Sequence, residues 1–411
     1  MNITTANTVN DFDISNSLPD QCNQGTWIGR VWLPAQHASN NIAGPRVVSV
    51  SQGKVYDLSN IYLTMSDLFA DENKVANIKE NQSQNPNKVL GSLDEILSNS
   101  LFTKQAGTYE ESTEIILLAP NDIQATKACG VTFARSLLER VIEEQARGDA
   151  QKASKIRANI LQVIGANLGE LTPGSPEADE LKQKLIAQGI WSQYLEVGIG
   201  PDAEVFSKAQ PLASVTSGAQ IGVRRQSIWN NPEPEIVIAV NTEGVIIGAT
   251  LGNDVNLRDY EGRSALLLGK AKDNNAASSI GPLIRLFDDT FSLTDVEQCE
   301  VSLTIVGTDG FVTSGENLMA EISRSPQNLV DQTLNNQHQY PDGMMLYMGT
   351  MFAPTEDRHS DGNGFTHLPG DRVEISTEKL GTLVNWVNYC DAIPPWDYGV
   401  NKFISYLRQC R

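Results

Sequence analysis

The sequence predicts an α+β fold whose helices and strands occupy different parts of the chain. Helical spacing is confined to about residues 122–189, whereas short strand-like runs, turns and glycines dominate from about residue 197 onward. Side chains repeat about every 3.6 residues in a helix and every two residues in a strand, so this change of period indicates a change of structure. A chain of 411 residues with 40% hydrophobic content can bury a large core, in two domains or in one domain with an elaborate flank.

The first 120 residues predict an N-terminal α+β region. They are mixed, polar and rich in loops, with strand-like runs at RVVSVS (46–51) and EIILLA (114–119). They carry no motif that indicates a chemistry. We expect them to form oligomer contacts or to shape the mouth of a pocket.

Residues 121–190 predict a helical lid or linker segment. Residues 152–165 keep the helical pattern, and a later helix starts with Ser175 as N-cap and Pro176 at its first position and stops at Gly189. The first helix, which ends at Gly148, is indicated by apolar residues at helical spacing: Phe133, Leu137, Leu138, Val141 and Ile142.

Residues 191–411 predict a β-rich domain that contains a hairpin of special interest. The apolar runs IVIAV (236–240) and VIIGATL (245–251) are joined by the turn NTEG. Glu233 and Glu235 are two residues apart, so on an extended backbone their carboxylates point to the same face. If a two-residue turn closes the hairpin, Glu233 lies opposite Gly252, and Asp254 follows two residues later with the same parity.

Three carboxylates at the end of one hairpin predict a metal site. Glu233, Glu235 and Asp254 would repel one another unless they are protonated or neutralised by a cation. Hard oxygen ligands favour Mg²⁺, with Mn²⁺ or Ca²⁺ as alternatives, over zinc. The competing interpretation is a solvated strand end followed by an unrelated loop aspartate, which is common when spacing is the only signal. Lys272 follows within 20 residues of Asp254, and a lysine beside a metal can have its pKa lowered enough to act as a base.

Charge and cysteine usage exclude several classes of partner. A formal charge of −19 argues against nucleic acid or an anionic membrane as the main partner, because either would repel the protein. The N-terminal residues lack the basic and apolar regions of a signal peptide, and no apolar run approaches the length of a membrane span. The five cysteines are scattered and form no CxxC pair, so we expect a cytoplasmic protein without a disulfide framework.

Six motifs in order resemble the fumarylacetoacetate hydrolase superfamily across roughly residues 197–388. They are AEVFSKAQP, NNPEPEIVIAVN, GATLGNDVNLRD, KAKDNNAASSIGP, GTMFAP (349–354) and LPGDRVEISTEKLGTLVNWV. The resemblance implies a mixed β-sandwich roll, a homodimer or larger homo-oligomer, and a metal held by an E-x-E pair and a downstream aspartate. These ligands map to Glu233, Glu235 and Asp254, the family's lysine maps to Lys272, and its substrate-contacting threonine maps to Thr350.

The lid helix departs from the pattern of the superfamily's hydrolases, which activate water with a His-x-x-Glu pair. In VTFARSLLERV (131–141), Ser136 stands where that histidine would be, and Glu139 keeps the acid. The four histidines leave no imidazole between Ala38 and Gln337. The histidine that usually acts as the general base in hydrolysis is therefore missing from this helix.

The sequence more closely resembles the superfamily's dehydratases of 2-keto-3-deoxy pentonates, of which 2-keto-3-deoxyarabonate dehydratase is one. The resemblance implies a lyase of sugar acid catabolism that removes a C3 proton and the C4 hydroxyl and forms 2,5-dioxopentanoate. Glu204 and Lys272 are the candidate base and acid, in either order. Arg135 or Arg140 is a candidate for the substrate carboxylate. The residues expected at the substrate are Ser136, Arg140, Arg258 and Thr350.

Two other functions remain open from the sequence. A C–C hydrolase of acylpyruvates or an oxaloacetate decarboxylase of the same superfamily would use Glu139 without a histidine. A noncatalytic binding protein would keep the roll without the chemistry. Glu204 and Lys272 argue against the latter, since such groups usually mark working sites.

Overall fold

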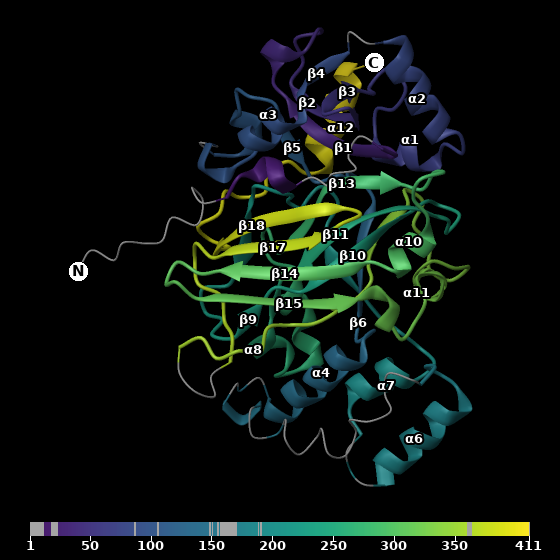
Figure 1. Ribbon diagram of the computed structural model, residues 1–411, viewed down its shortest axis with the longest axis vertical. Helices are drawn as coiled ribbons and strands as arrows, with labels where there is room; N and C mark the ends of the chain where they lie inside the picture. Colours follow the sequence, from purple (N-terminus) through teal and green to yellow (C-terminus); the bar gives the residue numbers. More distant parts are fainter. Residues whose placement is uncertain are drawn as a thin grey trace, which may run out of the picture.

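The protein is described by a computed structural model (Figure 1), which covers residues 12–17, 24–85, 88–104, 107–147, 149, 151–153, 156, 171–187, 189, 191–359 and 364–410. It is an α+β structure with large mixed sheets, as predicted. Among these described residues, no helix is both long and apolar enough to cross a membrane.

An 11-stranded sheet forms the main layer of the molecule. The strand order is β4-β3-β2-β1-β13-β11-β10-β16-β6-β7, and β5 also pairs with β1. Most neighbours are antiparallel, but β16 and β6 are parallel, so the sheet is mixed. The strands are β1 (Thr26–Leu33), β2 (Gly44–Ser51), β3 (Lys54–Asp57), β4 (Val89–Ser92), β5 (Ile116–Leu118), β6 (Ala125–Gly130), β7 (Glu204–Ala209), β10 (Pro234–Val240), β11 (Ile246–Asp254), β13 (Ser278–Leu286) and β16 (Met344–Tyr347).

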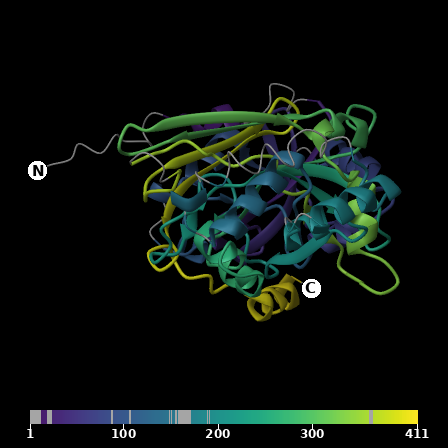
Figure 2. The ribbon, with the colours of Figure 1, turned by 90° about the horizontal axis from the view of Figure 1, so that it is seen from below.

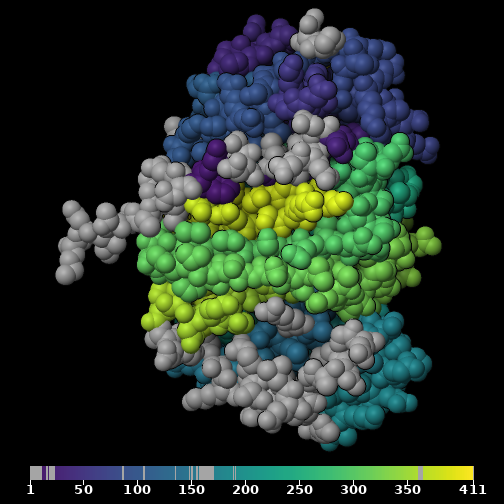
Figure 3. Space-filling view, in the orientation of Figure 1, coloured from purple at the N-terminus to yellow at the C-terminus, as the bar shows by residue number. Residues whose placement is uncertain are grey.

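A five-stranded sheet packs against this layer, with the strand order β15-β14-β17-β18-β8. A shared hydrophobic core joins the two sheets and includes Ile236 and Ile238 of the first sheet with Leu303 and Ile375 of the second. Figures 1 and 3 show β14, β15, β17 and β18 as a continuous band across the front of the molecule. The bounds are β8 (Gln220–Val223), β14 (Glu300–Val306), β15 (Val312–Leu318), β17 (Arg372–Thr377) and β18 (Gly381–Tyr389), with a separate pair β9 (Asn230–Asn231) and β12 (Asn256–Leu257).

The N-terminal region extends the main sheet at one edge. Strand β1 pairs with β13 in antiparallel register, with Trp27 opposite Arg285. Helix α12, at the other end of the chain, packs Phe403 and Tyr406 beside Trp32 of β1, and Figure 1 shows α12 among the N-terminal strands. The helices of this end of the molecule are α1 (Met65–Ala70), α2 (Lys74–Gln84), α3 (Leu93–Asn99) and α12 (Val400–Cys410).

Three helices cover the opposite end of the sheets (Figures 1 and 2). They are α4 (Ala134–Ala146), α6 (Pro176–Ala187) and α7 (Gln193–Ile199), and a cluster that includes Leu137, Val141 and Leu195 packs them together. Ser175 caps α6 as predicted, because its hydroxyl accepts a hydrogen bond from the amide of Ala178 at 3.2 Å. Most of the helical pattern predicted at 152–165 lies outside the described residues. The other helices are α8 (Arg258–Glu261), α9 (Leu268–Lys272), α10 (Leu293–Glu297) and α11 (Pro326–Thr333).

The hairpin register predicted for β10 and β11 is wrong by two residues. Gly252 lies opposite Glu235 rather than Glu233. One residue of the shift comes from a wider turn, in which the amide of Asn241 donates to the carbonyl of Val245 at 3.0 Å. The other comes from a bulge after Ala239. A shift of two preserves the alternation of faces, so the carboxylates still point the same way.

Candidate metal centre and active site

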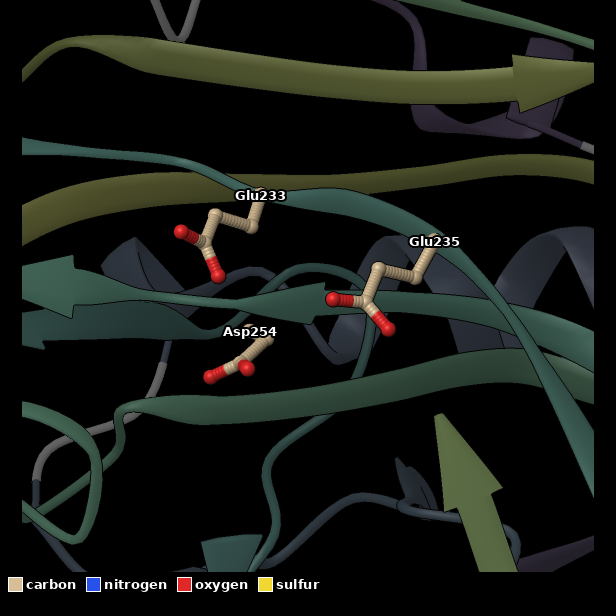
Figure 4. A group of neighbouring side chains, drawn as sticks. All are labelled: Glu233, Glu235 and Asp254. Atoms are coloured by element: carbon tan, nitrogen blue, oxygen red, sulfur yellow. The ribbon is translucent and has the colours of Figure 1, made fainter. Parts of the chain in front are cut away.

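Three acidic side chains converge where β10 begins and β11 ends (Figure 4). Glu233 directly precedes β10, Glu235 is the second residue of that strand, and Asp254 is the last residue of β11. The amide of Asp254 donates to the carbonyl of Glu233 at 3.1 Å, which places the two residues side by side. One carboxylate oxygen of each residue lies within 4.8 Å of the other two. We call these three residues the acidic centre.

The acidic centre is chemically suited to a divalent cation. All three side chains are buried, and among the described residues the Glu235 carboxylate accepts hydrogen bonds only from uncharged groups, the Gly349 amide at 2.7 Å and the Thr350 hydroxyl at 3.3 Å. Burial, with the charges of Asp254 and Glu233, raises the pKa of Glu235 well above its ordinary value. Two Mg–O bonds of about 2.0–2.1 Å allow at most about 4.2 Å between two ligand oxygens, so oxygens within 4.8 Å of one another need only a small movement to share one ion. The acidic centre therefore provides three ligands, and a bound cation would add the positive charge that favours ionised Glu235.

Two buried lysines approach the acidic centre from neighbouring elements. The ammonium of Lys272, at the end of α9, donates to Asp254 Oδ2 at 2.9 Å and also to the Glu233 carboxylate. Lys208 Nζ, from β7, lies 2.7 Å from Asp254 Oδ1 and donates to the carbonyl of Lys272 at 2.6 Å. Sequence reasoning found Lys272 and missed Lys208. The missed signal was parity, because Lys208 is four residues after Glu204 and shares its face of the strand.

The pKa of Lys272 was expected to be lowered beside a metal, and in the protein without an ion it is raised instead. Burial disfavours the ammonium, but the charges of Asp254, Glu233 and Glu261 outweigh burial and raise the pKa of Lys272 above its ordinary value. Lys272 is therefore a cation that binds two carboxylates.

Arg140 connects the lid helix α4 to the acidic centre. Its guanidinium forms ion pairs with Glu233, with Glu143 at 2.9 Å and with Glu261 at 2.8 Å. Burial alone would raise the pKa of Glu233, but Arg140 and Lys272 lower it to about 2. Glu233 is therefore held as an anion even without a metal.

Arg258 forms the second link between α4 and the β-rich domain. It donates through Nε to Glu143 at 2.6 Å and through Nη2 to Glu139 at 3.4 Å. Its guanidinium also stacks on Trp229, with 4.4 Å from Cζ to the ring centroid. Arg258 was expected at the substrate but contacts the lid helix instead. Glu139, the acid on that helix, is one of its partners.

Glu204 is the first residue of β7 and lies near the charged side chains of Glu261, Arg140 and Lys272. Burial and the charge of Glu261 raise the pKa of Glu204, whereas Arg140 and Lys272 lower it, and the net result is a pKa of about 7. Glu204 pairs in register with Gly130 of β6, and a Cβ at Gly130 would lie 1.9 Å from Glu204 Oε2. The glycine therefore leaves the space that the Glu204 carboxyl occupies.

A cavity of about 130 Å³ lies between α4 and the segment after β16. Ser136, Arg140 and Thr350 line it together with Glu139, Glu143 and Phe352, and none of the four histidines does. Ser136 donates its hydroxyl to the carbonyl of Phe133 at 2.9 Å. Three of the four residues expected at the substrate thus share one cavity, Arg258 lies outside it, and the side chain of Arg135 is outside the described part of the chain.

Two relatives of known name match a little under half of the chain. The "Probable 2-keto-3-deoxyxylonate dehydratase" of Haloferax volcanii is 34% identical over 194 residues, which are 47% of this chain and 63% of that protein. The "2-dehydro-3-deoxy-D-arabinonate dehydratase" of Saccharolobus solfataricus is 30% identical over 181 residues, which are 44% of this chain and 57% of that protein. The chain thus spans less than two thirds of the length of either relative.

Solved structures share the fold over most of the chain. An apo form of 2-keto-3-deoxy-D-arabinonate dehydratase superposes with a TM-score of 0.57 at 19% identity, over 88% of this chain and 99% of that one. The same named enzyme complexed with magnesium and 2,5-dioxopentanoate superposes with a TM-score of 0.55 at 19% identity, over the same shares of both chains. The family model "Fumarylacetoacetate (FAA) hydrolase C-terminal" matches residues 202–388, the range that holds the acidic centre, Glu204 and Lys272. The resemblance seen in the sequence is therefore confirmed over residues 202–388, which are similar to the fumarylacetoacetate hydrolase family.

Proposed function

We propose that this protein is a magnesium-dependent hydro-lyase that dehydrates a 2-keto-3-deoxy sugar acid, such as 2-keto-3-deoxyarabonate, to 2,5-dioxopentanoate. The observation that carries the proposal is the acidic centre with Glu204 and Lys272 beside it, a cation site next to one group that accepts a proton and one that donates it. The names of both relatives and the contents of the magnesium-bound structure support the same reaction. Mn²⁺ or Ca²⁺ are the alternative ions for the same oxygen ligands.

Glu233, Glu235 and Asp254 would hold the cation. When bound there, it supplies a Lewis acid that stabilises negative charge on the 2-oxo oxygen of the substrate. The protein's own residues then bind the substrate and move its protons. Arg140 and Ser136 line the adjoining cavity, and we propose that they orient the substrate together with Thr350. In this proposal Arg258 positions Glu143 and the lid helix rather than the substrate.

Glu204 is the proposed base and Lys272 the proposed acid. With a pKa of about 7, Glu204 is partly ionised at neutral pH and can take a proton from C3. Lys272 carries a proton that it can give to the departing C4 hydroxyl, so one water leaves. A proton then shifts from C5 to C3, and the resulting enol becomes the aldehyde of 2,5-dioxopentanoate. The proton on Glu204 then returns to Lys272 through solvent, so both residues recover their starting protonation states.

Hydrolysis lacks support in the same cavity. Ser136 occupies the place of the lid histidine of hydrolases, and its hydroxyl is engaged by the Phe133 carbonyl. Glu139, the remaining acid, pairs with Arg258. A water at this position would therefore lack a neutral imidazole to deprotonate it.

We also propose a cytoplasmic homodimer or larger homo-oligomer, organised as an N-terminal region (1–120), a lid segment (121–190) and a catalytic domain (191–411). Family resemblance supports the oligomer, and the scattered cysteines support a reducing compartment. Light scattering coupled to size-exclusion chromatography measures the assembly, and a monomeric mass would contradict this part of the proposal.

A substrate panel tests the reaction. The purified protein with Mg²⁺ is incubated with stereoisomeric 2-keto-3-deoxypentonates, and the semialdehyde product is measured through a coupled aldehyde dehydrogenase. At least one isomer should give product, and Glu204→Gln should not. If no isomer reacts while acylpyruvate absorbance is lost or CO₂ is released from oxaloacetate, the protein is a hydrolase or a decarboxylase instead.

A further inference from the structure

A second cavity, of about 280 Å³, lies between the N-terminal region and the turn that leads into β8. Its walls come from β1, from the segment around β5, from residues 212–220 and from the chain before α12. It shares no lining residue with the acidic centre or with the cavity beside α4. Nothing in the proposed dehydration uses it.

A buried cation lines this cavity. Arg30 of β1 is 4% exposed, and its Nη1 donates to the carbonyls of Asn121 at 2.5 Å and Ala119 at 3.3 Å. Within the described ranges, no carboxylate lies within 4.0 Å of its guanidinium, and its Nε and Nη2 have no hydrogen-bond partner. A buried charge normally has a counter-ion, because leaving water is costly for it. Arg30 thus offers two free donors toward the lumen.

The acids nearest to Arg30 are engaged elsewhere. The Asp122 carboxylate accepts backbone hydrogen bonds from Met65 and Ile123, both at 2.7 Å. Burial raises the pKa of Asp122 more than Arg30 lowers it, so this acid neutralises Arg30 poorly. Asp397 lines the cavity but is half-exposed and pairs with Lys402 at 3.2 Å. The cavity therefore retains a net positive inner wall.

Thr216 also lines the cavity, but its hydroxyl is buried against β13, where a Cβ at Gly281 would lie 2.2 Å from it. The hydroxyl therefore does not face the lumen. The rest of the wall is largely apolar or aromatic, and includes Phe102, Tyr109, Val215 and Trp396.

The size and polarity of the cavity define a class of ligand. An apolar cavity of about 150 Å³ accommodates benzene, so the larger volume here leaves room for a ring and a carboxylate. Two adjacent guanidinium donors match the two oxygens of one carboxylate. A neutral apolar molecule would leave Arg30 unpaired. A dianion would bring two negative charges into a cavity that offers one positive charge.

We infer that this cavity is a binding site for a small monocarboxylate with an apolar or aromatic body, in which Arg30 binds the carboxylate. The site is separate from the acidic centre.

Isothermal titration calorimetry of the full-length protein with benzoate, in the presence of EDTA, tests the inference. Benzoate should bind saturably, and benzamide, which has the same shape without the charge, should bind at least roughly tenfold more weakly. EDTA removes divalent cations, so a carboxylate cannot bind through a metal at the acidic centre.

Three variants locate the binding. Arg30→Gln removes the cation and Ala213→Phe adds bulk to the lumen from a wall residue on another segment, so each should weaken benzoate binding at least roughly tenfold. Arg46→Gln is the matched control, because Arg46 is equally buried on the neighbouring strand and does not line the cavity. If Arg30→Gln fails to fold, Ala213→Phe decides the question. Absence of benzoate binding, equal binding of benzamide, or unchanged binding in Ala213→Phe would overturn the inference.

Discussion

Glu204 shows how much of the proposed chemistry depends on one carboxyl group. Its pKa of about 7 results from burial and from the neighbouring Glu261, partly offset by Arg140 and Lys272. The carboxyl has room only because residue 130 is a glycine. At this scale the protonation state and the placement of a single side chain determine whether the site can remove a proton.

The pH dependence of catalysis should report Glu204. A base must be ionised, so kcat/KM should fall as pH decreases through about 7 and level off above it. In Glu204→Gln the rate should drop by about 10² or more and lose this limb. A pH–rate profile with saturating Mg²⁺ measures both. A rate that instead falls above pH 7 would mean that Glu204 is the acid.

Gly130→Ala should damage activity more than stability. The new Cβ would lie 1.9 Å from Glu204 Oε2, and the flexible end of the glutamate can move away without unfolding the sheet. We expect kcat/KM to fall by about 10², because small misplacements of a catalytic group are costly, while the melting temperature changes little. Gly399→Ala, whose Cβ would meet no atom within 4 Å, is the matched control and should leave both quantities unchanged. Equal kcat/KM in the two variants would contradict the role of Gly130.

At the scale of elements, α4 is held over the acidic centre by a buried ionic network. Arg140 reaches from α4 to Glu233, and Arg258 reaches back from α8 to Glu143. The helix and the hairpin are therefore coupled by charge as well as by packing. The helical spacing of α4 was predictable, because apolar periodicity is local. Its partners were not, since Glu143 and Arg258 are separated by more than a hundred residues.

Arg258→Met should loosen the lid helix. It leaves Glu143 and Glu139 without this partner in a buried setting, which typically costs about 3–5 kcal/mol. Denaturant unfolding should show the loss, and limited proteolysis should show faster cleavage around α4. The matched control is Arg225→Met, because Arg225 also pairs with an acid, Asp391 at 2.8 Å, and stacks on a ring, Tyr389, but at the surface. The control should behave like the unaltered protein; equal loss in both variants would contradict a specific role for Arg258.

At the scale of the whole molecule, the two packed sheets bury a cluster of acidic and basic side chains. Glu233, Glu235 and Asp254 are each at most 1% exposed, and Lys208 and Lys272 lie among them. Burying so many charged side chains costs free energy of folding. Such an arrangement is expected of a site that binds a cation, not of one that only stabilises the fold. Metal binding should therefore be linked to folding.

Magnesium should stabilise the protein, and Glu235→Gln should abolish the effect. At a free Mg²⁺ concentration of 100 times Kd the gain is about 2.7 kcal/mol, measurable as a rise in melting temperature over an EDTA-treated sample. Without metal, Glu235→Gln should be as stable as the unaltered protein or more so, because it removes one of three mutually repelling acids. A magnesium-dependent rise that persists in Glu235→Gln would place the ion elsewhere. Glu243→Gln, in the exposed turn of the same hairpin, is the control and should keep the full rise.

The sequence by itself determined the α+β class, the helical segment, the shared face of Glu233 and Glu235, and the resemblance to a known family, because these follow from local periodicity and from motifs read in order. The predicted face of these carboxylates was right even though the predicted register of β10 and β11 was wrong, because a shift of two residues preserves the face of a strand. The tertiary structure alone decided the turn and bulge that set Glu233 beside Asp254, the place of Lys208, the raised pKa of Lys272 and the unpaired charge of Arg30. Each of these depends on distances between segments remote in sequence, and electrostatic energies depend on those distances and on burial.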